Sequence, residues 1–318
     1  MRIIVLDGYT VNPGDNPWTP LEKLGSVEIF ERTAPEDVLA RAQDAEILII
    51  NKIRMTEEVF GQLTELRLVA VTATGYDCVD LDAARKHDVA VCNVPEYSTD
   101  SVAQFVFSLL LHLVHNVSIH DQLVREGEWQ RCGDFCFWRT PLVELSGRTI
   151  GIVGWGRIGR RVGTLAHAFG MNVLACSRSR RNAPDYGQFE WRDPATLFVE
   201  SDVVSLHCPL TAETSGMVNA ELLARMKPSA YLINTARGGL IVEQDLANAL
   251  AAEQLAGVAL DVAPQEPIHD DSPLLSAPCC VLTPHIAWAT LASRRRCLQI
   301  AAGNIEAFLA SRPRNLVT

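Results

Sequence analysis

Short apolar runs alternate with segments of helical spacing along most of the chain. The first series of apolar runs reads RIIVLD, EILII, LRLVAV and VAVCNV, with helix-like segments such as APEDVLARAQ and LDAARKH between them. A second series begins near residue 149 and reads TIGIVG, MNVLAC, DVVSLH, AYLINT, LAGVALD and CCVLTPH. β-Branched runs that alternate with helices are typical of parallel strands joined by crossover helices. The pattern predicts an α/β fold with two doubly wound lobes, each built on a parallel sheet.

The segment between the two series, residues 99–129, predicts one long apolar helix. It starts with Thr99 and Asp100, whose side chains favour a helix N-terminus. Its apolar centre, FVFSLLLHLVH, is shorter than a bilayer span and is interrupted by polar residues. We expect His112 and His115 on this helix to serve packing or hydrogen bonding rather than catalysis.

Charge and cysteine usage bear on partners and compartment. A formal net charge of -10 argues against general affinity for nucleic acid or for a membrane surface. The first apolar run is interrupted by an acidic residue and is shorter than the apolar region of a signal peptide. Cys92, Cys176 and Cys208 lie in apolar runs, where we expect buried, reduced thiols and therefore a cytoplasmic protein. Cys132 and Cys136 lack a second Cys/His pair of ligand spacing, so no metal site is expected.

The stretch RTIGIVGWGRIGRRVG carries a G-x-G-x-x-G pattern between a strand-like run and a helix-like segment. That context is the one that a dinucleotide-binding turn requires. Gly154 would make the tight turn, Gly156 would let the backbone approach a pyrophosphate, and Gly159 would let the helix pack against the strand. The helix that starts at Arg157 and Ile158 would then offer its N-terminal N–H groups to the phosphates.

Three polar residues each follow a strand-like run of the second series. Arg237 follows AYLINTA, Glu266 follows GVALDVAPQ, and His285 follows CCVLTP. Doubly wound sheets bind ligands beyond the carboxyl ends of their strands, so we expect these side chains at a ligand site. An arginine fork suits a carboxylate, and a histidine, with an ordinary pKa of about 6.5, suits proton transfer when a carboxylate orients it.

These segments and the glycine turn resemble the D-isomer-specific 2-hydroxyacid dehydrogenases, and the similarity runs through the whole chain in the same order. Within that family, TATGYDCVDLDAARKHDVAVCNVPEYSTDSVAQ and FCFWRTPLVELSGRTIGIVGWGRIG most resemble glycerate dehydrogenases, also called hydroxypyruvate or glyoxylate reductases. The resemblance implies a Rossmann cofactor domain and a flavodoxin-like substrate domain. It also implies NAD(P)H-dependent reduction of a small 2-oxoacid, with hydroxypyruvate or glyoxylate expected, to the D-2-hydroxyacid, and the reverse oxidation.

The resemblance implies roles for the residues that follow the strands. His285 would protonate the carbonyl oxygen as general acid, Glu266 would favour and orient the imidazolium, and Arg237 would bind the substrate carboxylate. Thr74 and Gly75, in TATGYD, match the family's carboxylate-binding loop. Glycine there would let the backbone come close to the substrate.

Three further residues match substrate-pocket positions of the family, and each has a plain structural alternative. Lys52, after EILII, resembles a residue that faces the substrate, but a surface lysine would look the same. Trp288 and Trp138 match aromatics that border the pocket, with core packing as the alternative for each. In such reductases the equivalent of Trp138 can enter the partner subunit's active site, which implies a homodimer.

The resemblance also implies a wider cofactor site. Asp261 matches the residue that holds the nicotinamide carboxamide. The remaining positions expected to contact the cofactor are Cys208, Pro209, Thr235, Ala236 and His285.

The end of the second strand of the cofactor lobe, NVLACSRSRR, bears on which dinucleotide is used. An NAD enzyme usually places Asp or Glu there to bind the adenine ribose. Here Ser177 stands in that place, Arg178 follows it, and the first carboxylate is Asp185. The segment predicts NADP(H) as the preferred cofactor, with NAD(H) possible.

The family's topology returns the last helix to the first lobe. This implies a substrate domain of residues 1–97 and 288–318 and a dinucleotide-binding domain of residues 98–287. Two other functions stay open. Some relatives are co-repressors that bind the dinucleotide with little turnover, and formate or phosphite dehydrogenases share the same fold.

Overall fold

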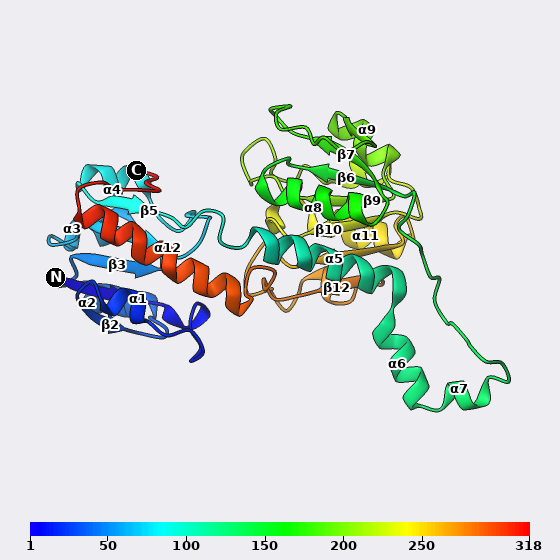
Figure 1. The fold of residues 1–318 in the computed structure, drawn as a ribbon, viewed down its shortest axis with the longest axis horizontal. Helices are drawn as coiled ribbons and strands as arrows, with labels where there is room; N and C mark the ends of the chain where they lie inside the picture. Colours follow the sequence, from blue (N-terminus) through cyan, green and yellow to red (C-terminus); the bar gives the residue numbers. More distant parts are fainter. The chain divides into compact units, whose positions relative to one another are not determined.

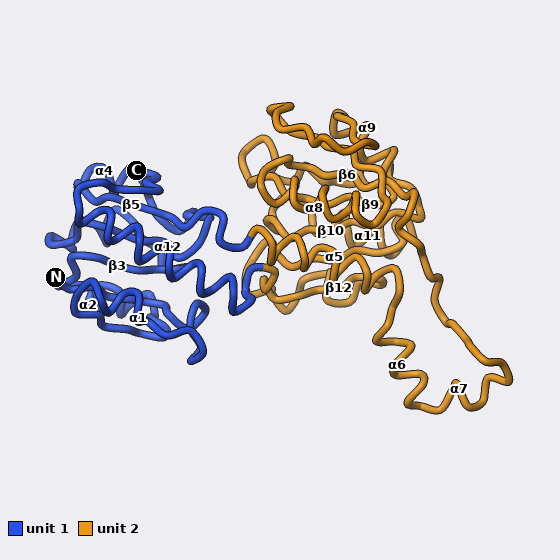
Figure 2. Tube along the Cα trace, in the orientation of Figure 1, with its two compact units in different colours: residues 1–98, 288–318 blue, residues 99–287 orange.

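The structure is a computed structural model that describes residues 1–318. The chain divides into two compact units (Figure 2). The first consists of Met1–Ser98 and Trp288–Thr318, and the second of Thr99–Ala287. The domain boundaries expected from the sequence fall after residues 97 and 287.

The first unit is built on a five-stranded parallel sheet of order β2-β1-β3-β4-β5. The strands are β1 (Arg2–Val5), β2 (Ser26–Ile29), β3 (Ile47–Ile50), β4 (Leu68–Val71) and β5 (Ala90–Cys92). The helices are α1 (Thr19–Glu22), α2 (Val38–Ala42), α3 (Glu57–Gln62), α4 (Leu81–Lys86) and α12 (Leu291–Leu309), with short 3-10 turns at Gly8–Thr10 and Pro35–Asp37. This strand order is the flavodoxin-like doubly wound arrangement that the sequence predicts.

Burial on both faces explains why the central strands read as unbroken apolar runs. All four residues of β3 and of β4 are buried. On one face Leu48 and Val69 join one apolar cluster, while Ile47 and Leu68 on the other join a second cluster that includes residues of α12. Parallel strands covered on both faces favour such continuous apolar sequences. Edge strand β2 was not predicted. Its residues are mostly exposed, so its sequence SVEI contains no apolar run.

The second unit is built on a seven-stranded parallel sheet of order β12-β11-β10-β9-β6-β7-β8 (Figure 1). The strands are β6 (Thr149–Val153), β7 (Asn172–Cys176), β8 (Phe189–Trp191), β9 (Val203–Leu206), β10 (Tyr231–Asn234), β11 (Gly257–Leu260) and β12 (Cys280–Leu282). The helices outside the amino-terminal segment are α8 (Arg157–Ala168), α9 (Pro194–Glu200), α10 (Ala220–Leu223) and α11 (Glu243–Ala251), with 3-10 turns at Gly238–Leu240 and Pro273–Leu275. The strands β6, β7 and β8 extend the sheet to one side, and β9 to β12 extend it to the other. Such sheets bind ligands at the point between β6 and β9 where the strand order reverses. Edge strand β8 was not predicted, for the same reason as β2.

The prediction of one helix over residues 99–129 is wrong, because the segment forms three helices. They are α5 (Thr99–His115), α6 (Val117–Arg125) and α7 (Glu128–Arg131). The breaks fall at Asn116 (φ 48°) and Gly127 (φ 81°), whose left-handed backbone cannot continue a right-handed helix. In Figure 1, α6 and α7 project away from the sheet of their unit.

Helix α5 is the apolar core helix that the sequence predicts. Val106, Leu110 and Val114 are each buried in a cluster shared with β6 and α8. No single helix has both the length and the apolar character of a membrane span. Only α5 and α6 taken together are long and apolar enough, and they are bent by 52° at the break between them.

The cysteines are less buried than the sequence suggests. All nine are free thiols. Cys92 is buried as expected, but Cys176 and Cys208 are only half-buried. Both lie where strands give way to loops, so they pack against the core with one side only.

Candidate active site

The glycine turn after β6 shows why each of its glycines is needed. Gly154 has φ +103°, and a Cβ there would lie 2.5 Å from the carbonyl carbon of His207. A Cβ at Gly159 would lie 2.1 Å from the carbonyl oxygen of Gly154. At Gly156, in contrast, a Cβ would meet nothing within 4 Å. The turn therefore packs tightly against β9 and α8 but leaves open space at its tip, where α8 begins at Arg157 without a side-chain cap.

The other residues expected to contact a cofactor surround this turn at the carboxyl edge of the sheet. Half-buried Ser177 and exposed Arg178 directly follow β7. Cys208 and Pro209 follow β9, and the Cys208 nitrogen would lie 2.6 Å from a Cβ at Gly154. Ile158, in the first turn of α8, packs against the apolar cluster around α5.

Two features fit a dinucleotide at this edge. The Thr235 hydroxyl is buried and has no hydrogen-bond partner, which is costly unless a ligand satisfies it. The open space over Gly156 at a helix N-terminus suits a phosphate. The residues present therefore fit a nicotinamide dinucleotide.

Arg237 is held by a residue that the sequence analysis missed. Asn234, the last residue of β10, is completely buried. Its Nδ2 donates to the carbonyl oxygen of Arg237 (2.8 Å), and its Oδ1 accepts from the N–H of Ala236 (3.0 Å). A Cβ at Gly238 would lie 1.9 Å from the carbonyl carbon of Ala263. Glycine at that position therefore lets the loop that carries Arg237 lie directly against the loop that carries Glu266.

His285 and Glu266 form the pair that the sequence predicts to act together. His285 Nδ1 lies 2.7 Å from Glu266 Oε2, and Glu266 Oε1 accepts from the N–H of Ala263 at 3.2 Å. His285 also has φ +55°, a left-handed backbone conformation that is strained for a residue with a side chain. The carboxylate orients the ring through Nδ1, so Nε2 takes no part in this contact.

Asp261 holds the segment on both sides of His285. Its side chain is completely buried at the end of β11. Oδ1 accepts from Thr283 Oγ1 (2.7 Å) and from the N–H of Ile286 (2.9 Å), and Oδ2 accepts from the N–H of Ala287 (2.8 Å). The carboxylate that the resemblance assigns to the cofactor thus positions the histidine segment as well.

A half-buried histidine beside the glycine turn, directly after β9, was also missed. His207 Nε2 lies 2.8 Å from the hydroxyl of buried Ser205. Burial lowers the pKa of His207 to about 3, so its ring is neutral at working pH. Polar residues that close apolar runs, as in VVSLH and AYLIN, are the sequence signal that could have revealed His207 and Asn234.

The substrate-site candidates of the first unit lie at the carboxyl edge of its sheet. Lys52 follows β3 and is exposed. An ordinary surface lysine would be exposed as well. Thr74 Oγ1 donates to the carbonyl oxygen of Val94 (3.0 Å), and Gly75 comes next in the loop after β4. Trp288 is half-buried and meets the Tyr97 ring edge-on, with centroids 6.2 Å apart.

Trp138 lies in the segment that follows α7. Its side chain is 63% exposed, so it does not pack in the core of its own chain. The structure does not bring it together with Arg237, Glu266 or His285 by any contact within the unit.

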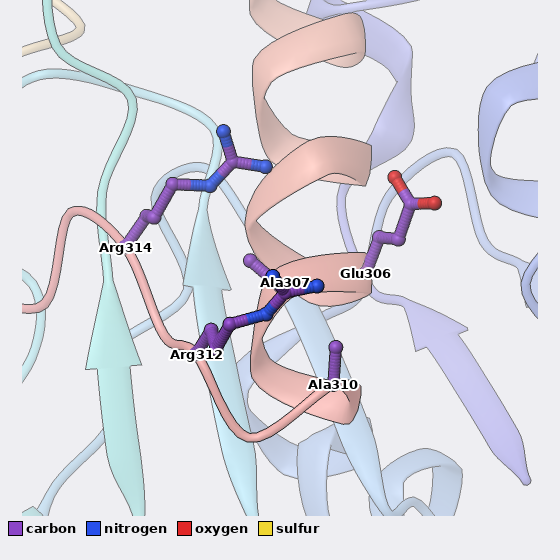
Figure 3. Close-up of a pocket in the computed structure, with 5 residues that line it drawn as sticks. All are labelled: Glu306, Ala307, Ala310, Arg312 and Arg314. Carbon is purple, nitrogen blue, oxygen red and sulfur yellow. The ribbon is translucent and has the colours of Figure 1, made fainter.

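Two cavities lie away from these residues. One, of about 580 Å³, lies at the end of α12 and is lined by Glu306, Ala307, Ala310, Arg312 and Arg314 (Figure 3). The other, of about 710 Å³, lies at the amino edge of the seven-stranded sheet, beside the end of α5. Neither contains a residue predicted to belong to the site. No group of three or more His, Cys, Asp or Glu side chains is arranged to hold a metal ion.

Comparisons with known proteins identify the family of the chain. The family model for the NAD-binding domain of D-isomer specific 2-hydroxyacid dehydrogenases matches residues 107–287. The chain is 46% identical over 320 residues to a hydroxypyruvate reductase from Blautia hydrogenotrophica, with 100% of this chain and 99% of the relative covered. It is 39% identical over 291 residues to a glycerate dehydrogenase from Methylorubrum extorquens, with 91% of this chain and 90% of the relative covered.

A solved structure gives the same result for the fold. An NADPH-dependent glyoxylate/hydroxypyruvate reductase from Sinorhizobium meliloti, in complex with citrate, matches with a TM-score of 0.85 at 28% identity. The match covers 100% of this chain and 97% of that one. The family resemblance and the fold of two parallel-sheet lobes are therefore confirmed. The chain belongs to the D-isomer-specific 2-hydroxyacid dehydrogenase family, and it is an oxidoreductase that uses a nicotinamide dinucleotide.

Proposed function

We propose that this enzyme reduces a small 2-oxoacid, hydroxypyruvate or glyoxylate, to the D-2-hydroxyacid with NAD(P)H, and catalyses the reverse oxidation. The observation that carries the proposal is the 2.7 Å contact between His285 Nδ1 and Glu266 Oε2. The loop that contains Glu266 lies against the loop that contains Arg237, as Gly238 shows. The relatives described above are named hydroxypyruvate reductase and glycerate dehydrogenase, which supports the same reaction.

In this proposal each residue of the set has one task. When bound, the reduced nicotinamide supplies a hydride to the carbonyl carbon of the 2-oxoacid. His285 Nε2 donates a proton to the carbonyl oxygen as negative charge develops there. Glu266 keeps the ring oriented through Nδ1 and stabilises the imidazolium before the proton leaves. Arg237 binds the substrate carboxylate through its guanidinium fork and so holds the carbonyl in place.

Four residues of the first unit are proposed to bind the substrate as well. The Thr74 and Gly75 turn would receive the carboxylate, and Lys52 would add a positive charge. Trp288 would border the substrate's side chain. All four belong to a single compact unit.

A substrate panel tests the reaction. Initial rates are measured with glyoxylate, hydroxypyruvate, pyruvate and larger 2-oxoacids, each with NADH and NADPH. We expect the highest kcat/KM with hydroxypyruvate or glyoxylate. Tight cofactor binding without reduction of any 2-oxoacid would overturn the proposal and favour a binding protein. Activity confined to formate or phosphite would instead assign one of those dehydrogenase reactions.

We also propose that NADP(H) is the preferred cofactor. Ser177 follows β7 where an acid would bind the free ribose, and exposed Arg178 comes next. The pKa of Glu213 is lowered first by the hydrogen bond from Thr211 and also by the charge of Arg178, so this charge reaches the loop after β9. A charge-assisted hydrogen bond contributes about 1.5–3 kcal/mol, which would favour NADPH by about 10–150-fold.

The double variant Ser177→Asp/Arg178→Ala tests the cofactor preference. It should prefer NADH, because a carboxylate repels the 2′-phosphate and accepts from the free ribose. The measurement is kcat/KM for both reduced cofactors. Arg225→Ala, which removes an arginine paired with Glu221 elsewhere in this unit, is the matched control and should keep the wild-type ratio. A wild type that prefers NADH contradicts the proposal.

We propose further that the enzyme is a homodimer. Large apolar side chains are exposed in and around α6 and α7: Val117 is 67% exposed, Trp129 51%, Phe135 89%, Trp138 63% and Leu142 55%. Exposed apolar side chains gathered in one segment mark an interaction surface. Sedimentation velocity should give a dimer for the wild type and a smaller species for Phe135→Asp. A monomeric wild type at micromolar concentration would refute the dimer.

The proposed compartment is the cytoplasm. All nine cysteines are free, as expected where thiols stay reduced. Fractionation of the producing cells, followed by an assay for 2-oxoacid reduction, tests this proposal.

A further inference from the structure

The carboxyl edge of the five-stranded sheet contains a carboxylate with no assigned role. Asp7 lies two residues beyond the end of β1, in the run RIIVLD. Its Oδ1 accepts from the N–H of Asn51 at 2.7 Å, and its Oδ2 accepts from the N–H of Lys52 at 2.6 Å. One side chain thus uses both of its oxygens to hold the turn that follows β3.

The held turn is also tied to the next strand. Asn51 is buried, and its Nδ2 donates to the carbonyl oxygen of Thr72 at 2.9 Å. Buried Thr72 in turn donates through Oγ1 to the carbonyl oxygen of Ile50 at 3.1 Å. The ends of β1, β3 and β4 are therefore joined through polar side chains, and Thr72 is two residues before Thr74. Fully paired buried networks of this kind fix a single local geometry.

Asp7 acts on Lys52 through charge as well as through the backbone. Burial raises the pKa of Asp7, while the N–H groups of Lys52, Asn51 and Ile53 and the positive charge of Lys52 oppose the rise. The positive charge of Lys52 also opposes the rise in the pKa of Cys78 that burial causes. The charge of Lys52 therefore acts on both Asp7 and Cys78, and Cys78 lies in the loop after β4.

We infer that Asp7 is a positioning residue, which holds the turn Asn51–Ile53 so that Lys52 presents its charge to the carboxylate of the substrate. This inference rests on the proposed substrate-binding role of Lys52. Lysine has a long, flexible side chain, so a fixed backbone and a nearby counter-charge limit the directions that its ammonium can take. Binding then costs less ordering of the side chain.

The test is Asp7→Asn in the full-length enzyme. The amide removes the negative charge and places an NH₂ group where an acceptor is needed. We expect KM for the 2-oxoacid to rise about tenfold, with kcat changed by less than about twofold, because binding rather than chemistry is affected. KM for the reduced cofactor should not change. Asp7→Glu, which keeps the charge at a shifted position, should give an intermediate KM.

A matched control lies at the opposite edge of the same sheet. Glu46 Oε2 accepts from the N–H of Arg2 at 2.8 Å, so it ties the start of β1 to the residue before β3. Glu46→Gln removes the negative charge from a comparable carboxylate–backbone hydrogen bond but should leave KM unchanged. A similar rise in KM for both variants would mean that Asp7 only stabilises the sheet, and would overturn the inference.

A double-mutant cycle separates this inference from the proposal on which it rests. Lys52→Met alone should raise KM, and Asp7→Asn added to it should raise KM by less than about twofold more, because the two residues act as a unit. If Lys52→Met raises KM but Asp7→Asn does not, only the positioning role fails. If Lys52→Met leaves KM unchanged, the proposed binding role of Lys52 is wrong, and the positioning role of Asp7 falls with it. Should Asp7→Asn not fold, Asp7→Glu decides, and a wild-type KM in it overturns the inference.

Discussion

The carboxyl edges of the two sheets position their functional groups to different degrees. At the seven-stranded edge, completely buried Asp261 holds the chain before and after His285 through three hydrogen bonds. At the five-stranded edge, half-buried Asp7 and the bond from Asn51 to Thr72 hold the turn of Lys52, but the lysine side chain itself is exposed. Proton transfer depends on distances of a fraction of an ångström, whereas attraction between charges varies slowly with distance. We propose that the more rigid seven-stranded edge carries the proton donor, while the looser five-stranded edge contributes only to substrate binding.

The largest effect is expected when the proposed proton donor at the rigid edge is removed. His285→Ala should lower kcat for 2-oxoacid reduction by about 10²–10⁴-fold, because general acid catalysis is lost. Cofactor affinity, measured by fluorescence titration, should stay close to that of the wild type. The control is His269→Ala, which should keep full activity. His269 lies between β11 and β12, and its Nδ1 is 2.5 Å from Asp271 Oδ1. Turnover of the His285 variant within threefold of the wild type would remove this residue from the mechanism.

The next effect tests the rigidity itself. Asp261→Asn should lower kcat by about 10²-fold with a smaller change in KM, because misplacing a catalytic group by about 1 Å has that cost. Asp202 lies at the amino edge of the same sheet, where it accepts from the N–H of Thr149 (2.8 Å) and from Lys227 Nζ (2.9 Å). Asp202→Asn should therefore lower thermal stability without this loss of kcat. Equal effects of both variants on kcat would contradict the comparison.

A smaller effect is expected where the rigid edge binds rather than reacts. Arg237→Lys keeps the charge but loses the paired donors, so KM for the 2-oxoacid should rise about tenfold or more. Cofactor KM should change little. Arg225→Lys on the surface of the same unit is the control. If the Arg237 variant binds and reduces the substrate normally, Arg237 has only a structural role.

The smallest expected effect is on stability and concerns His207 beside the glycine turn. Because its pKa falls from 6.5 to about 3 on folding, the neutral ring contributes stability above pH 6.5 that is lost as the pH falls towards 3. The wild type should therefore lose about 1.5 kcal/mol relative to His207→Asn between pH 6.5 and pH 5. Denaturant unfolding of both proteins at the two pH values measures this difference. A constant difference would show that His207 titrates normally in the folded protein.

Much of the fold could be predicted because burial acts on local sequence. Strands β3 and β10 are buried on both faces, so they appear as the apolar runs ILII and YLI. Edge strands β2 and β8 face solvent over much of their length, and their sequences carry no such run. The break between α5 and α6 depends on one left-handed residue, Asn116, within a continuous helical pattern.

The sequence by itself determined the chemistry, because its signals are local. A glycine turn between a strand and a helix, and Arg237, Glu266 and His285 directly after apolar runs, can each be recognised from neighbouring residues. Only the tertiary structure decided which side chains hold these groups in place. Asp7 is 45 residues from Lys52, and Asp261 is 26 residues from Ala287. Their hydrogen bonds depend on the order of the strands and on where each strand ends, and no local pattern in the sequence records either.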